Sequence, residues 1–409
     1  MDSRKILLVI FDGLGDRPLT ELGHKTPLEA TPKPNLDWFA ANGINGLVDP
    51  IAPGIVAGSD TSHLALFGYD PHDVYTGRGP FEAAGVGIDL LPGDIAFRGN
   101  FASVDSELKL TDRRAGRIRE GTEELAKAVD GMKIGRIKVT VRAGTEHRVA
   151  VVFRGRALSP KVTDTDPHEI GETILEAKPL ESAAKPTAKA VNAFTKQAYK
   201  LLKDHSVNRA RIARHEPPAN AIVLRGAGVY PEIVPITERL HLKAAGIAGV
   251  ALIRGMFRTV GMDVIDVPGA TGGLDTDMTA KADAALDALQ TYDLVVLHVK
   301  APDLCGHDGK ASEKIRVIER MDAMMGHLKG RLGSEVVVAI TADHSTPVAL
   351  KDHSGDPVPL TIFGEGVRVD GVLNFDERSV AAGALGTVRG LDVMNVLLSV
   401  ANHAEKYGA

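Results

Sequence analysis

Carboxylate and imidazole side chains follow three apolar segments of this chain, residues 6–11, 294–299 and 336–340. The residues concerned are Asp12, Asp303, His307, Asp343, His344 and His353. This mixture of ligand types suits Mn²⁺, Zn²⁺ or Co²⁺ better than Ca²⁺, and the set is too large for one tetrahedral ion. Two ions that lie roughly 3.5–4 Å apart are a common apparatus for phosphoryl transfer. The pattern therefore predicts a two-metal centre for phosphoryl chemistry.

Local spacing indicates how these ligands are shared. Asp303 and His307 are four residues apart, which places both side chains on one face of a helical turn. Asp343 and His344 are adjacent and point in different directions, so they serve either two neighbouring ions or one ion in a loop. Taken singly, such residues are more often turn formers, helix caps or satisfied core groups. Their joint occurrence at three strand ends favours the shared metal site.

Ser59 is the candidate nucleophile. It stands where a helix is expected to start, and the helix macrodipole favours an ionised serine there. Metal coordination would activate the hydroxyl further, and the amide groups that follow would bind phosphate. The alternative is that Ser59 only caps the helix. His63 lies one turn further on the same face and is a candidate phosphate ligand.

Alternating strands and helices must position these residues. The three segments that precede the acid and imidazole groups are apolar and β-branched, as in strands that are buried on both faces. Further strands are expected at 221–224, 250–253 and 358–363, and helices at 35–41, 236–245, 275–290, 312–328 and 391–403. This rhythm predicts an α/β fold, a mostly parallel sheet with helices on both faces.

The middle of the chain has a different character. Residues 135–155 are typical of an antiparallel hairpin, and helical patterns flank it at 120–130 and 189–203. The Pro217-Pro218 pair marks a seam, after which the strand–helix alternation returns. We therefore expect a discontinuous sheet domain and an inserted α+β domain. Their expected bounds are 1–89 with 219–409 for the first and 90–218 for the second.

Composition narrows the class of protein. The 409 residues are 44% hydrophobic and 25% charged with a formal net charge of -5, which indicates neither nucleic-acid binding nor a polybasic membrane patch. No apolar run approaches the roughly 20 residues that cross a bilayer. The single cysteine, Cys305, fits a reducing compartment. The apolar start ends early, at Asp12, and lacks a signal-peptide cleavage pattern, so a cytoplasmic protein is expected.

Five motifs carry a resemblance to a known family. They are DG at 12–13, GSDTSH at 58–63, PDLCGH at 302–307, TADHSTP at 341–347 and DHSGDPVP at 352–359. Together and in this order they resemble the alkaline-phosphatase superfamily. Within it, the chain is similar to the archaeal-type, cofactor-independent phosphoglycerate mutases over nearly its full length. The resemblance implies an alkaline-phosphatase-like metal-binding domain with an inserted domain that closes over the substrate.

The resemblance also implies roles for the metal ligands. Ser59 would be the phosphorylated nucleophile, and two divalent ions would serve as cofactors, with Mn²⁺ expected and Mg²⁺, Zn²⁺ or Co²⁺ as alternatives. One ion would be held by Asp12, Ser59, Asp343 and His344, and the other by Asp303, His307 and His353. The bacterial branch has Asn and Glu beside its serine where this chain has Gly58 and Asp60. Roles of those flanking side chains are therefore not carried over.

The implied substrate carries a carboxylate and a phosphate, for which arginine is the preferred bidentate partner. The candidates we favour are His63, Arg98, Arg114, Arg225, Arg254 and Lys300. The expected partners are thus the small molecules 3-phosphoglycerate and 2-phosphoglycerate, with no nucleic acid and no membrane. The sequence makes no prediction about the oligomeric state.

The implied reaction is an isomerisation shared by glycolysis and gluconeogenesis. Ser59 takes the phosphate of 3-phosphoglycerate, the bound glycerate turns, and its other hydroxyl recovers the phosphate, without bisphosphoglycerate. The first alternative is a metal-dependent phosphomonoesterase or phosphodiesterase on the same scaffold. The second is a phosphotransferase that passes the phosphate to another alcohol. The arginines of the inserted domain favour the mutase over the hydrolase, and a non-catalytic regulatory relative is disfavoured because every expected ligand position is filled.

Overall fold

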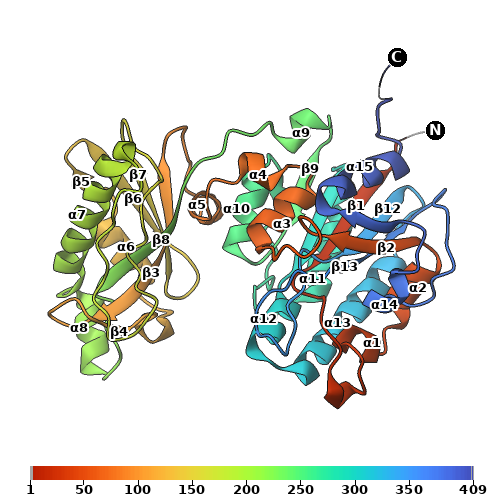
Figure 1. Ribbon diagram of the computed structural model, residues 1–409, viewed down its shortest axis with the longest axis horizontal. Helices are drawn as coiled ribbons and strands as arrows, with labels where there is room; N and C mark the ends of the chain where they lie inside the picture. Colours follow the sequence, from red (N-terminus) through yellow and green to blue (C-terminus); the bar gives the residue numbers. More distant parts are fainter. Residues whose placement is uncertain (1–2, 407, 409) are drawn as a thin grey trace. The chain divides into compact units, whose positions relative to one another are not determined.

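A computed structural model describes residues 3–406 and 408. Its contacts divide the chain into two compact units. The larger unit combines the residues up to Val74 with those from Ile233 onward, and the smaller unit spans Tyr75–Glu232. Segments from both ends of the sequence therefore build the larger unit (Figure 1).

The larger unit is built on one eight-stranded sheet within the described residues. In spatial order its strands are β10 (Asp263–Val264), β9 (Ala244–Ile247), β11 (Leu294–Val299), β1 (Lys5–Phe11), β12 (Val336–Thr341), β13 (Val358–Phe363), β2 (Ile44–Asp49) and β14 (Gly386–Arg389). The three central strands β11, β1 and β12 run parallel, whereas β13 is antiparallel to both of its neighbours. The predicted mostly parallel α/β sheet is confirmed.

Helices cover this sheet in two layers (Figure 1). One layer contains α1 (Pro27–Ala30), α2 (Pro34–Ala41), α11 (Met278–Ala288), α12 (Ala301–Asp308) and α13 (Ala311–Lys329), and the other contains α3 (Ser59–Leu66), α10 (Ala251–Thr259) and α15 (Gly390–Val400). The short helices α4 (Pro71–Val74), α9 (Ile236–Arg239) and α14 (Glu377–Val380) complete the unit. Strands β11 and β12 are buried along their whole length, as their apolar, β-branched sequences predict.

Two predictions in the larger unit are wrong. Residues 250–253 fall at the start of helix α10, and the strand of this region is β9, Ala244–Ile247. The predicted helix 236–245 ends at Arg239 because the chain then enters β9. The sequence of β9, AAGI, consists mainly of small residues. Gly246 is required there because a Cβ atom would lie 2.3 Å from the Phe257 ring of α10. The close packing of α10 on β9 thus requires small residues, which lack the bulky pattern by which a strand is recognised in a sequence.

The smaller unit contains a six-stranded, largely antiparallel sheet within the described residues. Its strands are β3 (Ile95–Val104), β4 (Leu110–Asp112), β5 (Lys133–Ile134), β6 (Ile137–Ala143), β7 (Arg148–Arg154) and β8 (Ala221–Val229). The predicted hairpin is present as β6 and β7. Helices α6 (Thr122–Val129) and α7 (Lys185–Leu202) pack on this sheet, and α5 (Gly79–Gly85) and α8 (Ser206–Ala213) complete the unit.

The chain passes from one unit to the other at different positions from those that the sequence predicts. The strand predicted at 221–224 belongs to the smaller unit, because β8 pairs with β3 along most of its length. Helix α5 also belongs there, since it contacts β3, β7 and β8. The boundaries therefore lie at Tyr75 and Glu232 instead of residues 90 and 218. The proline pair at 217–218 precedes a strand of the smaller unit and does not separate the two units.

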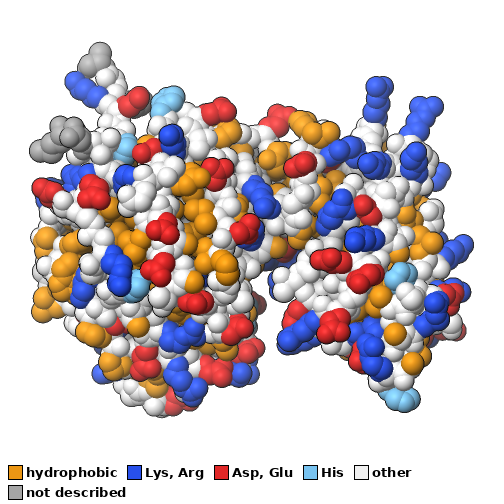
Figure 2. Space-filling view, turned by 180° about the vertical axis from the view of Figure 1, so that it is seen from behind, with side chains coloured by type: hydrophobic (Ala, Val, Ile, Leu, Met, Phe, Trp, Pro, Cys, Tyr) orange, Lys and Arg blue, Asp and Glu red, His pale blue; other side chains and the backbone are white. Residues whose placement is uncertain are grey.

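On the face of the molecule shown in Figure 2, acidic and basic side chains are interspersed. Within the part of the chain that the structure describes, every helix is too short or too polar to cross a membrane.

Candidate metal and phosphoryl-transfer site

The carboxyl ends of the three central strands bring the predicted ligands together. Asp12 directly follows β1, and Asp343 lies just beyond β12. Helix α12 begins two residues after β11 and carries Asp303 and His307 one turn apart. Because β11, β1 and β12 are parallel neighbours, their ends meet at one edge of the sheet. Every residue that we predicted as a metal ligand lies at this edge or in the loop that follows β12.

The first ligand group surrounds Asp12. The His344 Nε2 atom lies 3.5 Å from Asp12 Oδ1 and 3.3 Å from Asp343 Oδ2. The hydroxyl of Ser59, the first residue of α3, lies 3.1 Å from the same His344 nitrogen. All four side chains are buried. Asp343 Oδ2 has no hydrogen-bond partner among the described residues, so one buried carboxylate oxygen lacks a donor.

The second ligand group surrounds Asp303. Its Oδ1 atom lies 3.4 Å from His307 Nε2 and 3.5 Å from His353 Nε2. The two imidazole Nε2 atoms are 3.2 Å apart. Each ring donates its Nδ1–H to a backbone carbonyl, of Lys351 for His307 and of Ala57 for His353. When both rings are neutral, their Nε2 atoms therefore carry lone pairs that converge on one point.

The two groups are contiguous through Thr346 and His344. The Thr346 hydroxyl donates to Asp303 Oδ1 at 2.7 Å and therefore accepts from His344 Nδ1–H, 3.2 Å away. This contact leaves the His344 Nε2 lone pair facing Ser59 and Asp12. The His344 ring also stacks on His353 with centroids 3.7 Å apart. Sequence reasoning missed Thr346, because a threonine after a strand gives no signal of its own.

Lys300 links the two groups electrostatically. Its Nζ atom lies 2.8 Å from Asp12 Oδ1 and 2.7 Å from Asp303 Oδ2. Burial alone would lower the pKa of Lys300, but the carboxylates of Asp12, Asp303 and Asp343 raise it. Burial would raise the pKa of Asp303, yet the Lys300 ammonium and the nearby histidines hold it well below its usual range. The Asp303 carboxylate is thus ionised and attracts positive charge.

The histidines respond to the same field. Burial lowers the pKa of His344 to about 3, so its ring is neutral and presents a lone pair. Burial would also lower the pKa of His353, but the hydrogen bond with Asp303 and the Ala57 carbonyl raise it. This corner of the site therefore favours a positive charge.

The donor set fits divalent metal ions. Three groups of side chains place a ligand atom of each member within 4.8 Å of the others. They are Asp12 with Asp343 and His344, Asp303 with His344 and His353, and His307 with Asp352 and His353. The unpartnered Asp343 oxygen and the facing imidazole lone pairs are the observations that a bound cation would explain.

Two predicted substrate residues in the larger unit already have partners. His63 is fully buried on α3, and its Nδ1–H donates to the Ser59 carbonyl at 2.7 Å. Its ring therefore supports the start of the helix. Arg254 lies on α10 and forms an ion pair with Asp266 Oδ1 at 2.5 Å.

The other predicted arginines lie in the smaller unit. Arg98 on β3 and Arg225 on β8 are direct partners in the antiparallel ladder. Glu82 of α5 lies 3.4 Å from Arg98 and 3.5 Å from Arg78. The Nε atoms of the three arginines are buried and have no hydrogen-bond partner among the described residues. Sequence reasoning missed Arg78 and Glu82, because neither follows a recognisable motif.

Positive charge dominates this arginine cluster, which we define as Arg78, Arg98, Arg114, Arg148 and Arg225. Burial, together with Arg78, Arg225 and Arg148, lowers the pKa of Arg98 to about 9 against the opposing effect of Glu82. Burial, Arg148 and Arg114 likewise lower the pKa of His147 to about 4. Several guanidinium groups facing one carboxylate, with unpaired donors, form an anion-binding arrangement.

Comparison with known proteins places the chain in a family. Residues 40–208 match the family model described as 2,3-bisphosphoglycerate-independent phosphoglycerate mutase. A relative of that name in Methanothermobacter thermautotrophicus is 49% identical and aligns with 99% of this chain and all of its own length. Another in Sulfurisphaera tokodaii is also 49% identical, and both chains are fully covered.

Solved structures agree with this assignment. A protein from Pyrococcus horikoshii has a TM-score of 0.88 at 41% identity, and each chain is fully covered. The cofactor-independent phosphoglycerate mutase from Thermoplasma acidophilum has a TM-score of 0.73 at 39% identity, over 97% of this chain and all of the other. This chain therefore belongs to the 2,3-bisphosphoglycerate-independent phosphoglycerate mutase family.

Proposed function

We propose that this protein interconverts 3-phosphoglycerate and 2-phosphoglycerate without bisphosphoglycerate, through phosphorylation of Ser59. The observation that carries the proposal is the contact of 3.1 Å between the Ser59 hydroxyl and His344 Nε2, inside the ligand group of Asp12 and Asp343. This contact supports Ser59 as a nucleophile beside a group of side chains that fits a metal ion. Identity of 49% over the full length with relatives named as such mutases supports the same reaction.

The position of Ser59 suits a phosphorylated residue. Its side chain is only 4% exposed, which limits the access of water to a phosphoserine. It is the first residue of α3, where the helix dipole stabilises negative charge. The neutral His344 accepts the hydrogen bond of the Ser59 hydroxyl, which holds the hydroxyl beside the ligand group of Asp12 and Asp343.

The residues that would hold two divalent ions are those of the two ligand groups. Asp12, Ser59, Asp343 and His344 would bind one ion, and Asp303, His307 and His353 the other. When bound, such ions supply Lewis-acid polarisation of the serine oxygen and the phosphoryl oxygens. Mn²⁺ is the expected ion, with Mg²⁺, Zn²⁺ and Co²⁺ as alternatives, because the ligands mix carboxylate oxygen with imidazole nitrogen.

Substrate binding is assigned to cationic residues of both units. Lys300 is 18% exposed and lies between the two groups, so it is placed to contact a phosphoryl oxygen. Arg98, Arg225 and Arg114 would bind the anionic ends of phosphoglycerate, helped by Arg78. An anion there would accept hydrogen bonds from the buried Nε atoms of Arg78, Arg98 and Arg225, which have no hydrogen-bond acceptor among the described residues. We also propose that the smaller unit excludes water while glycerate turns.

A coupled assay tests this function. The protein is supplied with 3-phosphoglycerate and Mn²⁺ in the absence of bisphosphoglycerate, and 2-phosphoglycerate is detected through enolase. We expect turnover by the wild-type protein and none by Ser59→Ala. The matched control is Ser62→Ala, because Ser62 lies on the same helix and its hydroxyl donates to the backbone carbonyls of Gly58 and Ser59. Release of inorganic phosphate without 2-phosphoglycerate would instead identify a hydrolase.

A further inference from the structure

His298 is a buried histidine. It belongs to none of the three sets of side chains whose ligand atoms lie within 4.8 Å of one another. It lies near the end of β11, paired in parallel register with Ile10 of β1, two residues before Asp12. Its Nε2–H donates to Asp12 Oδ2 at 2.9 Å. Its other ring nitrogen, Nδ1, has no partner among the described residues. The ring therefore makes one directed polar contact, and that contact is with Asp12.

This contact separates the two oxygens of the Asp12 carboxylate. Oδ2 accepts from His298, whereas Oδ1 lies 2.8 Å from Lys300 Nζ and 3.5 Å from His344 Nε2. A carboxylate that is free to rotate would exchange these positions. The hydrogen bond from His298 prevents this rotation of the carboxylate. A half turn about the last side-chain bond of Asp12 would only swap two equivalent oxygens, and any smaller rotation breaks the hydrogen bond.

Neighbouring elements fix the position of His298 itself. Lys281 of α11 donates from Nζ to the His298 carbonyl at 3.1 Å, which holds the backbone. The His63 ring of α3 packs beside the His298 ring, with centroids 5.3 Å apart. His63 is held in turn by its bond to the Ser59 carbonyl. The donor is thus rigidly placed from the strand, from α11 and from α3.

We infer that His298 is a positioning residue, which holds Asp12 so that Oδ1 faces the ion of the Ser59 group. Hydrogen bonds to a ligating carboxylate fix its orientation, and loss of such a partner typically lowers metal affinity about 10–100-fold. The inference rests on the metal site of the proposed function. It adds that ligand geometry at Asp12 is set from β11, a strand that supplies no ligand to that ion.

Metal titration of the purified, metal-free protein tests this role. Mn²⁺ binding is measured by calorimetry for wild type, His298→Leu and His298→Gln, and each variant is melted in the presence of a chelator. Leucine removes the donor, so Mn²⁺ affinity at one of the two sites should fall about 10–100-fold. Glutamine places an amide N–H at a similar reach and should restore most of the affinity. Val296→Ala, at a fully buried position of the same strand, should bind Mn²⁺ as wild type does.

The outcomes separate the inference from the function on which it rests. Wild-type affinity in His298→Leu would overturn the positioning role and leave the metal site intact. A loss in His298→Gln equal to that in His298→Leu, with both melting as wild type, would also overturn it, since the N–H donor would then be irrelevant. Absence of Mn²⁺ binding by the wild-type protein would refute the metal site itself. If His298→Leu fails to fold, His298→Asn replaces it, because the shorter amide does not reach Asp12 and should lose affinity.

Discussion

The Nε2 atoms of His307 and His353 face one another at 3.2 Å, while both rings donate Nδ1–H to backbone carbonyls. Two lone pairs at this distance repel each other unless a proton or a metal ion lies between them. Asp303 Oδ1, within 3.5 Å of each nitrogen, adds negative charge to the same point. The folded chain therefore holds lone pairs and negative charge close together, and a bound cation would stabilise them.

Substitution of one of these histidines should remove one ion. We expect His353→Ala to lose one of the two Mn²⁺ ions that we propose for the wild-type protein, because Asp303 and His307 alone leave the coordination incomplete. Metal analysis after dialysis measures this stoichiometry. His327→Ala is the control, since His327 pairs with Asp283 and belongs to none of the ligand groups. Equal metal content in His353→Ala and wild type would contradict the assignment.

Asp343→Asn should change stability in opposite directions with and without metal. In the metal-free protein, Asp343 Oδ2 is a buried carboxylate oxygen without a hydrogen-bond donor, whereas a neutral asparagine amide costs less free energy to bury. The free energy of unfolding should therefore rise by about 1–3 kcal/mol. In Mn²⁺ it should fall below that of wild type, because a ligand charge is lost. Urea unfolding with chelator and with Mn²⁺ measures both; a change of the same sign in both conditions would refute the site.

The arginine cluster should govern KM. On the proposed function, Arg98→Met and Arg225→Met would each remove a charge-assisted contact to the substrate. Such a contact is typically about 1.5–3 kcal/mol, so KM should rise roughly 10–100-fold. Steady-state kinetics with 3-phosphoglycerate measure the change. The control is Arg154→Met, whose guanidinium is paired with Asp94 in the same unit. An unchanged KM in both cluster variants would remove these arginines from the substrate site.

Lys281 should make stability depend on alkaline pH. It is fully buried, bonds only to backbone carbonyls of Thr271 and His298, and burial lowers its pKa to about 8 from 10.5. Between these two pH values Lys281 is protonated in the unfolded chain but not in the folded chain. Its contribution to stability therefore increases as pH rises from 8 to 10.5, by about 3 kcal/mol. Urea unfolding of wild type and Lys281→Met across this range isolates the effect. A difference between the two that is independent of pH would exclude it.

Much of the candidate metal site could be predicted from the sequence because the proposed ligands lie at recognisable places. The apolar runs before Asp12 and Asp343 are long and β-branched, and the spacing of Asp303 and His307 is that of one helical turn. Parallel strands then bring these positions to one edge without further information. The start of α3 at Ser59 was predictable for the same kind of local reason.

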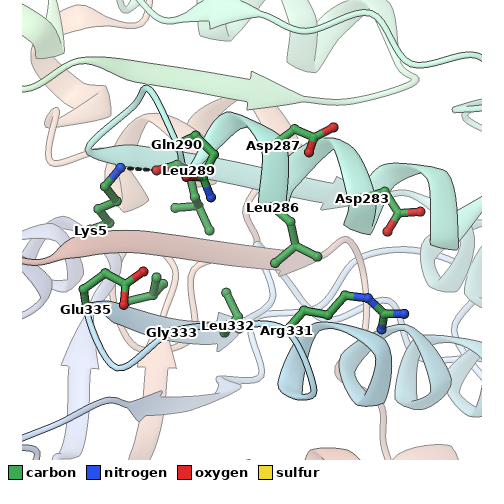
Figure 3. Close-up of a pocket in the computed structure, with 11 residues that line it drawn as sticks. Lys5, Asp283, Leu286, Asp287, Leu289, Gln290, Arg331, Leu332, Gly333 and Glu335 are labelled. Carbon is green, nitrogen blue, oxygen red and sulfur yellow. Dashed lines mark hydrogen bonds between the residues drawn. The ribbon is translucent and has the colours of Figure 1, made fainter.

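Other features depend on contacts that no local pattern encodes. Strand β9 is made of small residues because Phe257 packs against Gly246, and the pairing of β8 with β3 joins segments far apart in the sequence. His298 is hidden within an apolar run. The pocket between α11 and the start of β12, with Leu286 and Leu332 directed toward its centre (Figure 3), likewise arises only from packing.

Isotope retention tests the central claim, transfer of phosphate between two hydroxyls of one glycerate, most directly. The protein is given a mixture of unlabelled 3-phosphoglycerate and 3-phosphoglycerate that carries heavy carbon in the glycerate and heavy oxygen in the phosphoryl group. Mass spectrometry of the 2-phosphoglycerate formed shows whether the labels stay together. We predict that labelled phosphate remains on labelled glycerate, because the glycerate stays bound while Ser59 holds its phosphate. Random redistribution of the two labels would contradict this account.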